Sequence, residues 1–397
     1  MEMHSLPEEA LTEILVKLPI RSVLRCISVC KTWKALIRNP YFADYHLKNH
    51  QDNKDDMVLI RQLKYENLRC ISQDLFLTRD DHHKKLHLLF PRLELPNPDQ
   101  VVYARGSCNG ILCFSDIHCR FVYLCNPITR ECFTLPESTL ADPGCPLVEL
   151  GFGFDPYTKD YKVIAILERN PGPVWIQIYK LSTNCWSRVD IDELENGVFS
   201  INGAGSGVFF KGILHWWMGS RLRLNDHVLT FDLHAERFGS IECPNLFDNP
   251  NSILTVLGGD SLALVSMVKR AHDGYAFRVW VMKEYGNHES WTHKYTIAQF
   301  LADYCRPFWH EPSGEYHIPS WRHLTCWNGD ELLLVNLEDQ EQMVSYKLFQ
   351  KNDFTTTQEQ CKEVDIGRDL LKSHINPRVI KFQPSLESIS RRRNYFL

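Results

Sequence analysis

The pattern of hydrophobic and polar positions divides the chain into two parts. Across residues 1–47, apolar side chains recur at the spacing of an α-helix, and the first set is Leu11, Ile14, Leu15 and Leu18. From Met57 onward, short alternating or fully apolar runs are separated by turn residues, which is typical of β-strands. The pattern therefore predicts an α+β multidomain chain, in which a small helical domain precedes an all-β domain and the polar residues 48–56 form a linker.

The helical domain is expected to contain three short helices. Ser5 and Glu8 have the spacing of a capping box at the start of the first helix. Pro19 ends that helix, because the residue before a proline is pushed out of the α region. The other two helices are expected at about residues 21–29 and 31–37, and Asn39-Pro40 stops the last one.

These helices carry more apolar surface than they can bury alone. About half of residues 6–38 are aliphatic, Cys or Trp, and they occupy more than one face of each helix. A unit of this size has too little interior to cover them. The helices must therefore dock on the rest of the chain or on another protein, and the pattern leaves both possibilities open.

The all-β part contains a repeat of four strand-like runs. The turn in the second hairpin of each unit lies at Asn126, Ser182, Asp232, Tyr285 and Gln340, and these turns are roughly 50 to 56 residues apart, the period of a kelch-like blade. An irregular β-sandwich is the alternative, but four strands per period favour a β-propeller. Further strand-like pieces lie at 57–63, 68–77, 378–382 and 386–389, so we expect about six blades within 57–390, the last shared between both ends of the domain.

Composition excludes several classes of protein. Charged residues are 23% and hydrophobic residues 44% of the chain, which is typical of a globular protein, and the formal net charge of −5 disfavours nucleic-acid binding. No signal peptide and no membrane-spanning run is expected. The 14 cysteines contain no Cys-x-x-Cys pair, so we interpret them as reduced, mostly buried side chains of a cytoplasmic and/or nuclear protein. Residues 391–397 form a short basic tail.

Motifs for chemistry are absent from the sequence. It has no Gly-x-Ser-x-Gly elbow and no Walker A loop, and the glycine-rich residues 203–207 precede a strand instead of a helix. His82, His83 and His87 lie among Asp and Lys residues, which is more typical of a solvated loop than of a metal site. We therefore expect no catalytic residues, no cofactor and no metal. A propeller enzyme stays the alternative, because it would need side chains that converge from distant blades.

The helical segment resembles the F-box motif. The residues that carry the resemblance are Leu6, Pro7, Ile14, Leu15, Leu18, Pro19, Val29, Cys30, Lys31 and Trp33, in the order and N-terminal position of that motif. F-boxes dock on the Skp-type adaptor of cullin-RING ubiquitin ligases (SCF complexes). The resemblance implies adaptor contacts at the same positions except Lys31, and cullin and RING subunits as further partners. The chain departs from the common plant pattern at Cys26-Ile27-Ser28.

The repeats resemble the plant F-box-associated, kelch-like domain. The segments that carry this resemblance are 106–112, 125–130 with 135–136, 151–155 with 160–163, 280–282 with 290–291, and 384–389. In that family the repeats hold a target protein while the F-box holds the ligase. The resemblance implies a non-catalytic substrate-recognition subunit that presents a target for ubiquitination and degradation. The alternatives are an S-locus F-box-type receptor of a ribonuclease, and a scaffold that works without a ligase.

Long connections are expected to gather on one face of the propeller. The turns within hairpins are short, whereas the other connections are long, and long loops on a rigid scaffold are where recognition usually occurs. The loop 298–322 has the aromatic and arginine content of an interface, although its rings could also pack on its own blade. The predicted target-binding residues in this loop and in 219–226 are Arg221, Arg223, Tyr304, Arg306, Phe308, Trp309 and Tyr316.

Overall fold

The computed structural model describes most of the helical part and most of the strands. The described residues are 6–50, 57–66, 69–79, 87–88, 102–116, 119–138, 147–168, 174–189, 207–218, 227–243, 252–269, 275–297, 325–327, 331–335, 343–347, 361–364 and 379–390.

Four helices open the described chain, one more than the sequence pattern predicted. They are α1 (Glu8–Val16), α2 (Ile20–Cys26), α3 (Lys31–Ile37) and α4 (Pro40–Asn49). Asn39 and Pro40 end α3 and also begin α4, because the Asn39 carboxamide oxygen accepts a hydrogen bond from the Tyr41 N–H at 2.9 Å and Pro40 occupies the first turn. Two residues of the predicted linker, Lys48 and Asn49, are therefore helical.

Two helix boundaries also differ from the prediction. The capping box is wrong, because α1 begins at Glu8 with Pro7 as its N-cap and no side-chain cap, whereas the box needs Glu8 three residues inside the helix. Helix α2 starts directly after Pro19 and ends at Cys26 instead of continuing to about residue 29. The segment between α2 and α3 leaves Val29 in a turn.

The described strands form six four-stranded antiparallel sheets. In spatial order these are β24 (Val379–Phe382), β1 (Met57–Glu66), β2 (Arg69–Arg79) and β3 (His87–Leu88); β4 (Tyr103–Cys108), β5 (Ile111–Ser115), β6 (Val122–Asn126) and β7 (Glu131–Thr134); β8 (Leu147–Asp155), β9 (Asp160–Glu168), β10 (Val174–Lys180) and β11 (Cys185–Val189). The next sheets are β12 (Val208–Phe210), β13 (Ile213–Met218), β14 (His227–Asp232) and β15 (Arg237–Glu242); β16 (Ser252–Leu257), β17 (Ser261–Lys269), β18 (Tyr275–Met282) and β19 (Trp291–Ile297); and β20 (Thr325–Trp327), β21 (Glu331–Val335), β22 (Met343–Lys347) and β23 (Cys361–Val364).

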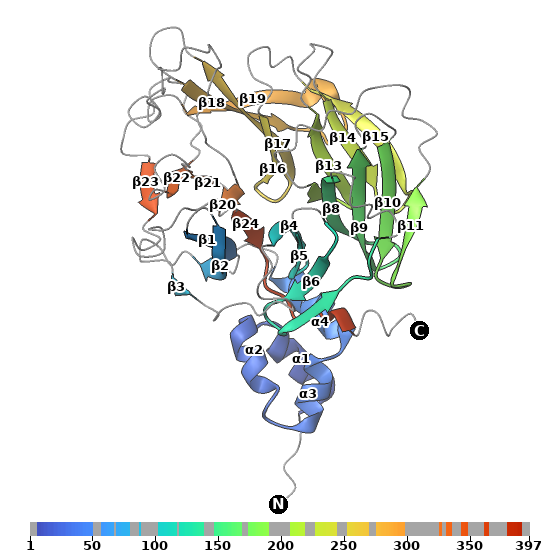
Figure 1. Cartoon of the computed structure of the whole chain (residues 1–397). Helices are drawn as coiled ribbons and strands as arrows, with labels where there is room; N and C mark the ends of the chain where they lie inside the picture. The colour runs from blue at the N-terminus through green and yellow to red at the C-terminus, as the bar shows by residue number, and fades with distance from the viewer. Residues whose placement is uncertain are drawn as a thin grey trace, which may run out of the picture.

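The sheets follow one another around a common centre (Figure 1). Their first strands touch in a closed cycle of β4, β8, β12, β16, β20 and β24. The ring closes because β24 pairs with β1, from Met57 opposite Phe382 to Ile60 opposite Val379. Helices followed by a propeller of four-stranded blades, with one blade shared between the two ends, are therefore confirmed; the blade count of the whole chain stays a prediction.

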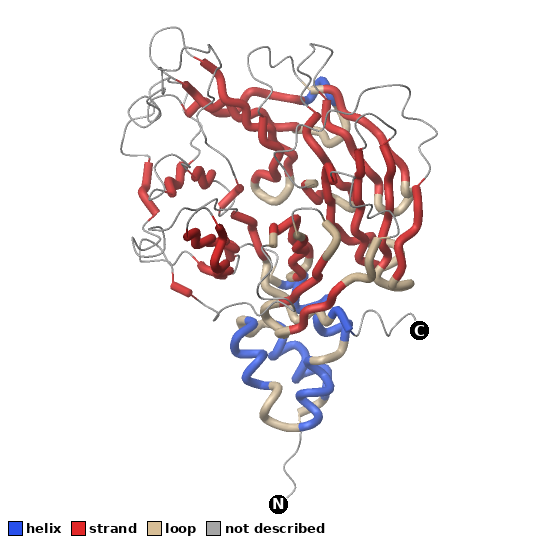
Figure 2. The backbone as a smooth tube through the Cα atoms, in the orientation of Figure 1, coloured by secondary structure: helices blue, strands red, loops and turns tan. Residues whose placement is uncertain are grey.

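The helices pack on the sheet β4–β7 and form one lobe at the edge of the ring (Figure 2). One hydrophobic cluster joins the two parts of the chain. Its helical members include Leu15, Val16, Val23, Ile37 and Phe42, and its propeller members include Val102, Ala104, Leu112, Phe114, Tyr123, Ile128 and Leu386. Of the two possibilities that the sequence left open, docking on the rest of the chain therefore accounts for one side of the helices.

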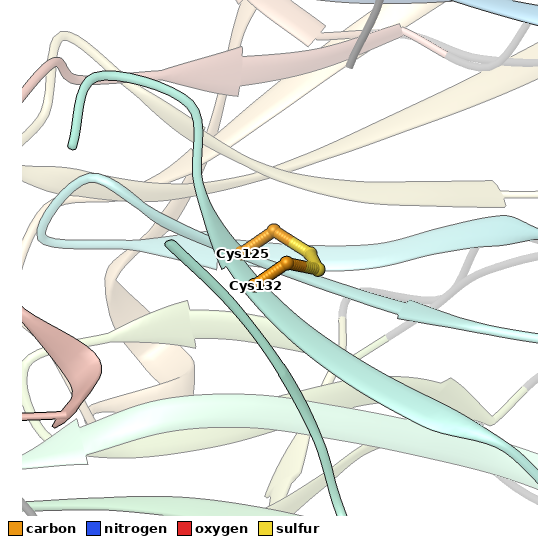
Figure 3. Close-up of a disulfide and its surroundings, with 2 residues drawn as sticks. All are labelled: Cys125 and Cys132. Atoms are coloured by element: carbon orange, nitrogen blue, oxygen red, sulfur yellow. A yellow bond between two sulfur atoms is a disulfide. The ribbon is translucent and has the colours of Figure 1, made fainter. Parts of the chain in front are cut away.

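Two strands adjacent to this cluster are linked through sulfur. Cys125 on β6 lies directly opposite Cys132 on β7, and their sulfur atoms are bonded (Figure 3). The prediction that the cysteines are reduced is wrong for this pair. Cys108, Cys113 and Cys119 are free and buried, and burial raises the pKa of each thiol, to about 11 for Cys119.

A buried lysine ties neighbouring blades together. The Lys162 Nζ on β9 donates to the Asp155 carboxylate at 3.1 Å and, on the next blade, to the Glu236 carboxylate at 2.9 Å and the Leu233 carbonyl. Burial alone would raise the pKa of Asp155, but hydrogen bonds from the Thr158 hydroxyl, the Tyr157 N–H and Lys162 outweigh it and hold that pKa well below its usual range. This cluster of hydrogen bonds therefore joins the two blades, with Asp155 as a carboxylate.

Replacing Lys162 with Met should lower the free energy of unfolding by about 3 to 5 kcal/mol, because the Asp155 carboxylate would stay buried without its cation. Lys180→Met is the matched control, since Lys180 pairs with the same Glu236 but is partly exposed, and its loss should cost about 1 kcal/mol or less. Urea unfolding of both variants measures the difference. Equal losses would show that burial of Lys162 has no special weight.

A second bond between blades contains a histidine. His215 on β13 is fully buried, and its Nδ1 lies 3.1 Å from the Val208 carbonyl oxygen while its Nε2 lies 2.7 Å from the Tyr285 hydroxyl. A carbonyl only accepts, so Nδ1 carries the proton and Nε2 accepts from Tyr285. Burial lowers the pKa of His215 to about 4.

This histidine should make the propeller less stable in mild acid. The unfolded chain gains a proton on residue 215 as the pH falls through about 6.5, whereas the folded chain gains it only near pH 4, so stability is complete above the first value and decreases toward the second. The expected loss is up to about 3 kcal/mol. His215→Gln should flatten this part of the pH profile of thermal unfolding, whereas the exposed control His288→Gln should not. A profile that is unchanged in His215→Gln would contradict the assignment.

Candidate interaction surface on the N-terminal helices

Exposed large hydrophobic side chains gather on the helices. Among the side chains that the structure describes, six such residues are exposed, and five of them lie in residues 6–45. These five are Leu6 (59% exposed), Ile14 (50%), Val29 (61%), Tyr41 (70%) and Tyr45 (38%); the sixth is Tyr157 (77%) on the propeller. An apolar surface of this kind on a small helical unit marks an interaction site.

Helix α1 explains how one segment serves two sides. Leu11 and Leu15 lie four residues apart, share one face of the helix, and are buried in the cluster with the propeller. Ile14 precedes Leu15 by one residue, which rotates it by about 100° to the exposed side. The adjacent pair Ile14-Leu15 therefore divides its side chains between solvent and core.

The nine residues predicted to contact the adaptor fall into three groups. Leu6, Pro7, Ile14, Pro19, Val29 and Cys30 are exposed, Leu18 and Trp33 are half-buried against the core cluster, and Leu15 is buried in it. Leu15 would therefore act by packing and not by direct contact. The remaining residues stay predicted contacts.

Local bonds hold the exposed residues in place. Val29 lies between α2 and α3, and Cys30 is the N-cap of α3, where its Sγ accepts from the Trp33 N–H at 3.5 Å. The Glu13 carboxylate accepts from the Tyr45 hydroxyl at 2.7 Å, which joins α1 to α4 on the exposed side. The surface is thus built on interlocked helices.

His46 on α4 and His50, the residue after α4, contact carbonyl groups at and just beyond the end of α1, and the sequence pattern did not predict them. His46 Nε2 lies 2.9 Å from the Leu18 carbonyl oxygen, and His50 Nε2 lies 3.0 Å from the Val16 carbonyl oxygen. The two rings stack with centroids 4.3 Å apart. Carbonyl groups at the end of a helix lack partners within it, so these rings supply donors to them. The His-x-x-x-His spacing, which places both rings on one helix face, is the signal that could have predicted this.

The residues predicted to bind a target lie outside the described residues: Arg221, Arg223, Tyr304, Arg306, Phe308, Trp309 and Tyr316. The described strands show where one of the two segments, 219–226, begins. Strand β13 leaves the tight turn at Lys211-Gly212 and ends at Met218, which pairs with His227 at the far end of the sheet. Ile128, in the tight turn between β6 and β7, belongs to the hydrophobic cluster that joins the helices to the propeller. Segment 219–226 therefore begins at the end of this sheet that lies away from the tight turn at Lys211-Gly212.

Within the described residues, no group of three or more His, Cys, Asp or Glu side chains could hold a metal ion. No helix among those residues is long and apolar enough to cross a membrane.

Comparison with known proteins gives the family. Residues 3–45 match the model of the F-box domain, and residues 60–389 match that of the F-box associated beta propeller domain. An F-box/kelch-repeat protein of Arabidopsis thaliana is 30% identical over 77% of this chain and 83% of its own length. A second F-box protein of Arabidopsis thaliana is 28% identical over 87% of this chain and 84% of its own, and the F-box protein CPR1 of that plant is 26% identical over 75% and 74%.

The two matches together cover both parts of the fold, and the larger covers most of the chain. The F-box with a propeller is the arrangement of substrate-recognition F-box proteins of SCF type, and an F-box indicates a Skp-type adaptor as partner. The chain belongs to the plant family of F-box proteins that carry an F-box-associated β-propeller domain.

Proposed function

We propose that the exposed side of the F-box helices docks the Skp-type adaptor, and through it cullin and RING subunits, while the propeller binds a target protein for ubiquitination and degradation. The observation that carries this proposal is the division of the F-box: Leu15 and Phe42 are buried against the propeller, whereas Ile14 and Val29 stay exposed. In this scheme the chain itself does not catalyse formation of the covalent bond to ubiquitin. It raises the concentration of the target beside the ubiquitin-charged enzyme.

The same observation separates the main proposal from a scaffold that works without a ligase. Such a scaffold would not need apolar side chains exposed on the F-box, and these cost solubility when they have no partner. A receptor of a ribonuclease would share the adaptor surface and differ only in its target. Recovery of the target with and without proteasome inhibition distinguishes these possibilities.

Charged residues on the exposed side should strongly weaken adaptor binding. Ile14→Asp and Val29→Asp each place a carboxylate where the adaptor would bury an apolar side chain, so the dissociation constant should rise at least about 30-fold. Tyr157→Asp is the control, since Tyr157 is also a large exposed hydrophobic side chain but lies on the propeller. Titration calorimetry with a purified Skp-type adaptor measures all three.

Melting curves should stay within about 2 °C of the wild type for all three variants, because none of these side chains lies in the core. Unchanged adaptor affinity in Ile14→Asp and Val29→Asp would contradict the proposed docking surface. Equal loss in Tyr157→Asp would show that the effect is not specific to the helices.

The proposed target surface is tested separately. Trp309→Ala should weaken recovery of the physiological target several-fold and leave adaptor affinity intact, because an aromatic anchor in a long loop contributes to recognition and not to the helices. Thr158→Ala, in the tight turn of β8–β9, is the control and should leave target recovery unchanged. Early melting of Trp309→Ala would show that its ring packs in the core. Normal melting with full recovery would place the target surface elsewhere.

A further inference from the structure

The chain after the last propeller strand runs beneath the sheet that carries the F-box. Residues 383–390, the C-terminal strap, follow β24 directly and are mostly buried. In Figure 1 this segment descends from β24 beside β4–β6 and reaches α4. The sequence pattern predicted a strand at 386–389, which is wrong, because the strap pairs with no strand and ends in a helical turn. It is held by side chains.

Asn126 provides the first attachment. Its Nδ2 donates to the Ser385 carbonyl at 3.1 Å and to the Glu387 carbonyl at 2.7 Å, and the side chain is fully buried. Its Oδ1 accepts from the N–H groups of Ile128 and Thr129 and so shapes the β6–β7 turn. The Asn126 carboxamide therefore has two separate roles: its Nδ2 holds the strap and its Oδ1 shapes the turn.

Turns with the same hydrogen-bond pattern elsewhere in the ring show which of the two roles of Asn126 needs an amide. Asp155 and Asp232 begin the β8–β9 and β14–β15 turns, and each accepts from the N–H groups two and three residues later. An aspartate therefore suffices for the turn. Asparagine stands at 126, where two strap carbonyls need a donor.

Glu131 and Gly110 provide the other attachments. The Glu131 carboxylate accepts from the Ser388 hydroxyl and the Ile389 N–H, both at 2.8 Å. The Ser385 hydroxyl donates to the Asn109 carbonyl. Gly110 has a φ of +77°, and a Cβ there would lie 2.7 Å from the Ser385 backbone nitrogen, so only glycine allows both the turn and the close approach.

The strap in turn touches the F-box. Leu386 belongs to the cluster that contains the F-box core, and Ile389 belongs to the next cluster, between the sheets β4–β7 and β8–β11. The Gln383 Nε2 donates to the carbonyl of His50, the residue after α4, at 3.4 Å. Besides its hydrophobic contact with the sheet β4–β7, the F-box is thus attached through the covalent connection to β1 and through the strap that continues from its neighbour β24.

We propose that the C-terminal strap fixes the orientation of the F-box on the propeller, with Asn126 and Glu131 as positioning residues. Its purpose rests on the proposed function: a receptor that holds its target at a fixed distance from the ligase needs a rigid connection between the two domains. The geometry of the strap itself does not depend on that function.

The test is the full-length double variant Asn126→Asp with Glu131→Gln, without adaptor. Aspartate keeps both turn acceptors but cannot donate to Ser385 and Glu387 when ionised, and glutamine removes the carboxylate. Amide hydrogen exchange of residues 8–26 should become about tenfold faster or more, as for the loss of several net hydrogen bonds. Exchange in the distant sheet β12–β15 should not change. Asp232→Asn, an amide exchange in a turn without a strap, is the matched control and should change neither.

A second readout separates orientation from stability. Spin labels on noncanonical residues at positions 34 and 283, both exposed, should give one narrow distance distribution in the wild type and in Asp232→Asn, and a broad one in the double variant. Unchanged helix exchange, faster exchange in every sheet, or a lowered melting temperature with an unchanged distance distribution would each overturn the proposal. If the wild type fails to bind a Skp-type adaptor, the proposed function fails, whereas this comparison still decides the role of the strap.

Discussion

The structure depends on burial of one side of the F-box against a single blade of the propeller. Helices of this size cannot cover their own apolar surface, and the cluster around Leu15, Val16 and Phe42 is completed by propeller side chains that include Phe114 and Tyr123 of the sheet β4–β7. Each such side chain contributes about 1.5 to 3 kcal/mol when fully buried. Because that side is occupied, the apolar residues left outside are the surface that we propose for the adaptor. The division of labour within α1 is the physical basis of the proposed function.

The propeller supports this contact through bonds that cross between blades. Lys162 joins the sheets β8–β11 and β12–β15, and the His215–Tyr285 hydrogen bond joins β12–β15 to β16–β19. The pairing of β24 with β1 closes the ring, and the strap, which follows β24 directly, connects this closing strand to the F-box. The strand that closes the ring and the strap that contacts the F-box are therefore adjacent in the sequence.

The architecture could be predicted from the sequence because helices, strands and the blade repeat each leave a local pattern of residues. Helical spacing, turn residues and the period of about 50 residues depend on neighbours along the chain. Contacts between distant segments could not be read in this way. The fate of Leu15, which faces the core while Ile14 faces solvent, depends on where the propeller lies.

Other differences have similar causes. Asn39-Pro40 was interpreted only as a stop, although the same residues begin α4. Residues 386–389 were interpreted as a strand-like piece, but Asn126 and Glu131 make the hydrogen bonds that a neighbouring strand would make. Strand β4 was not predicted, since its sequence contains Arg105, Gly106 and Ser107 and lacks an apolar run. The Cys125–Cys132 pair depends on a register that sequence spacing does not give.

The central claim is that the F-box uses two different surfaces at once, one against the propeller and one for the adaptor. Hydroxyl-radical footprinting of the full chain, alone and with a Skp-type adaptor, tests it most directly, because it measures side-chain exposure. In the free chain Ile14 and Val29 should be oxidised, whereas Phe42 and Phe114 should be protected. Adaptor binding should protect Ile14 and Val29 and leave Phe42 and Phe114 protected. Oxidation of Phe114 in the complex, or undiminished oxidation of Ile14 and Val29, would contradict the account.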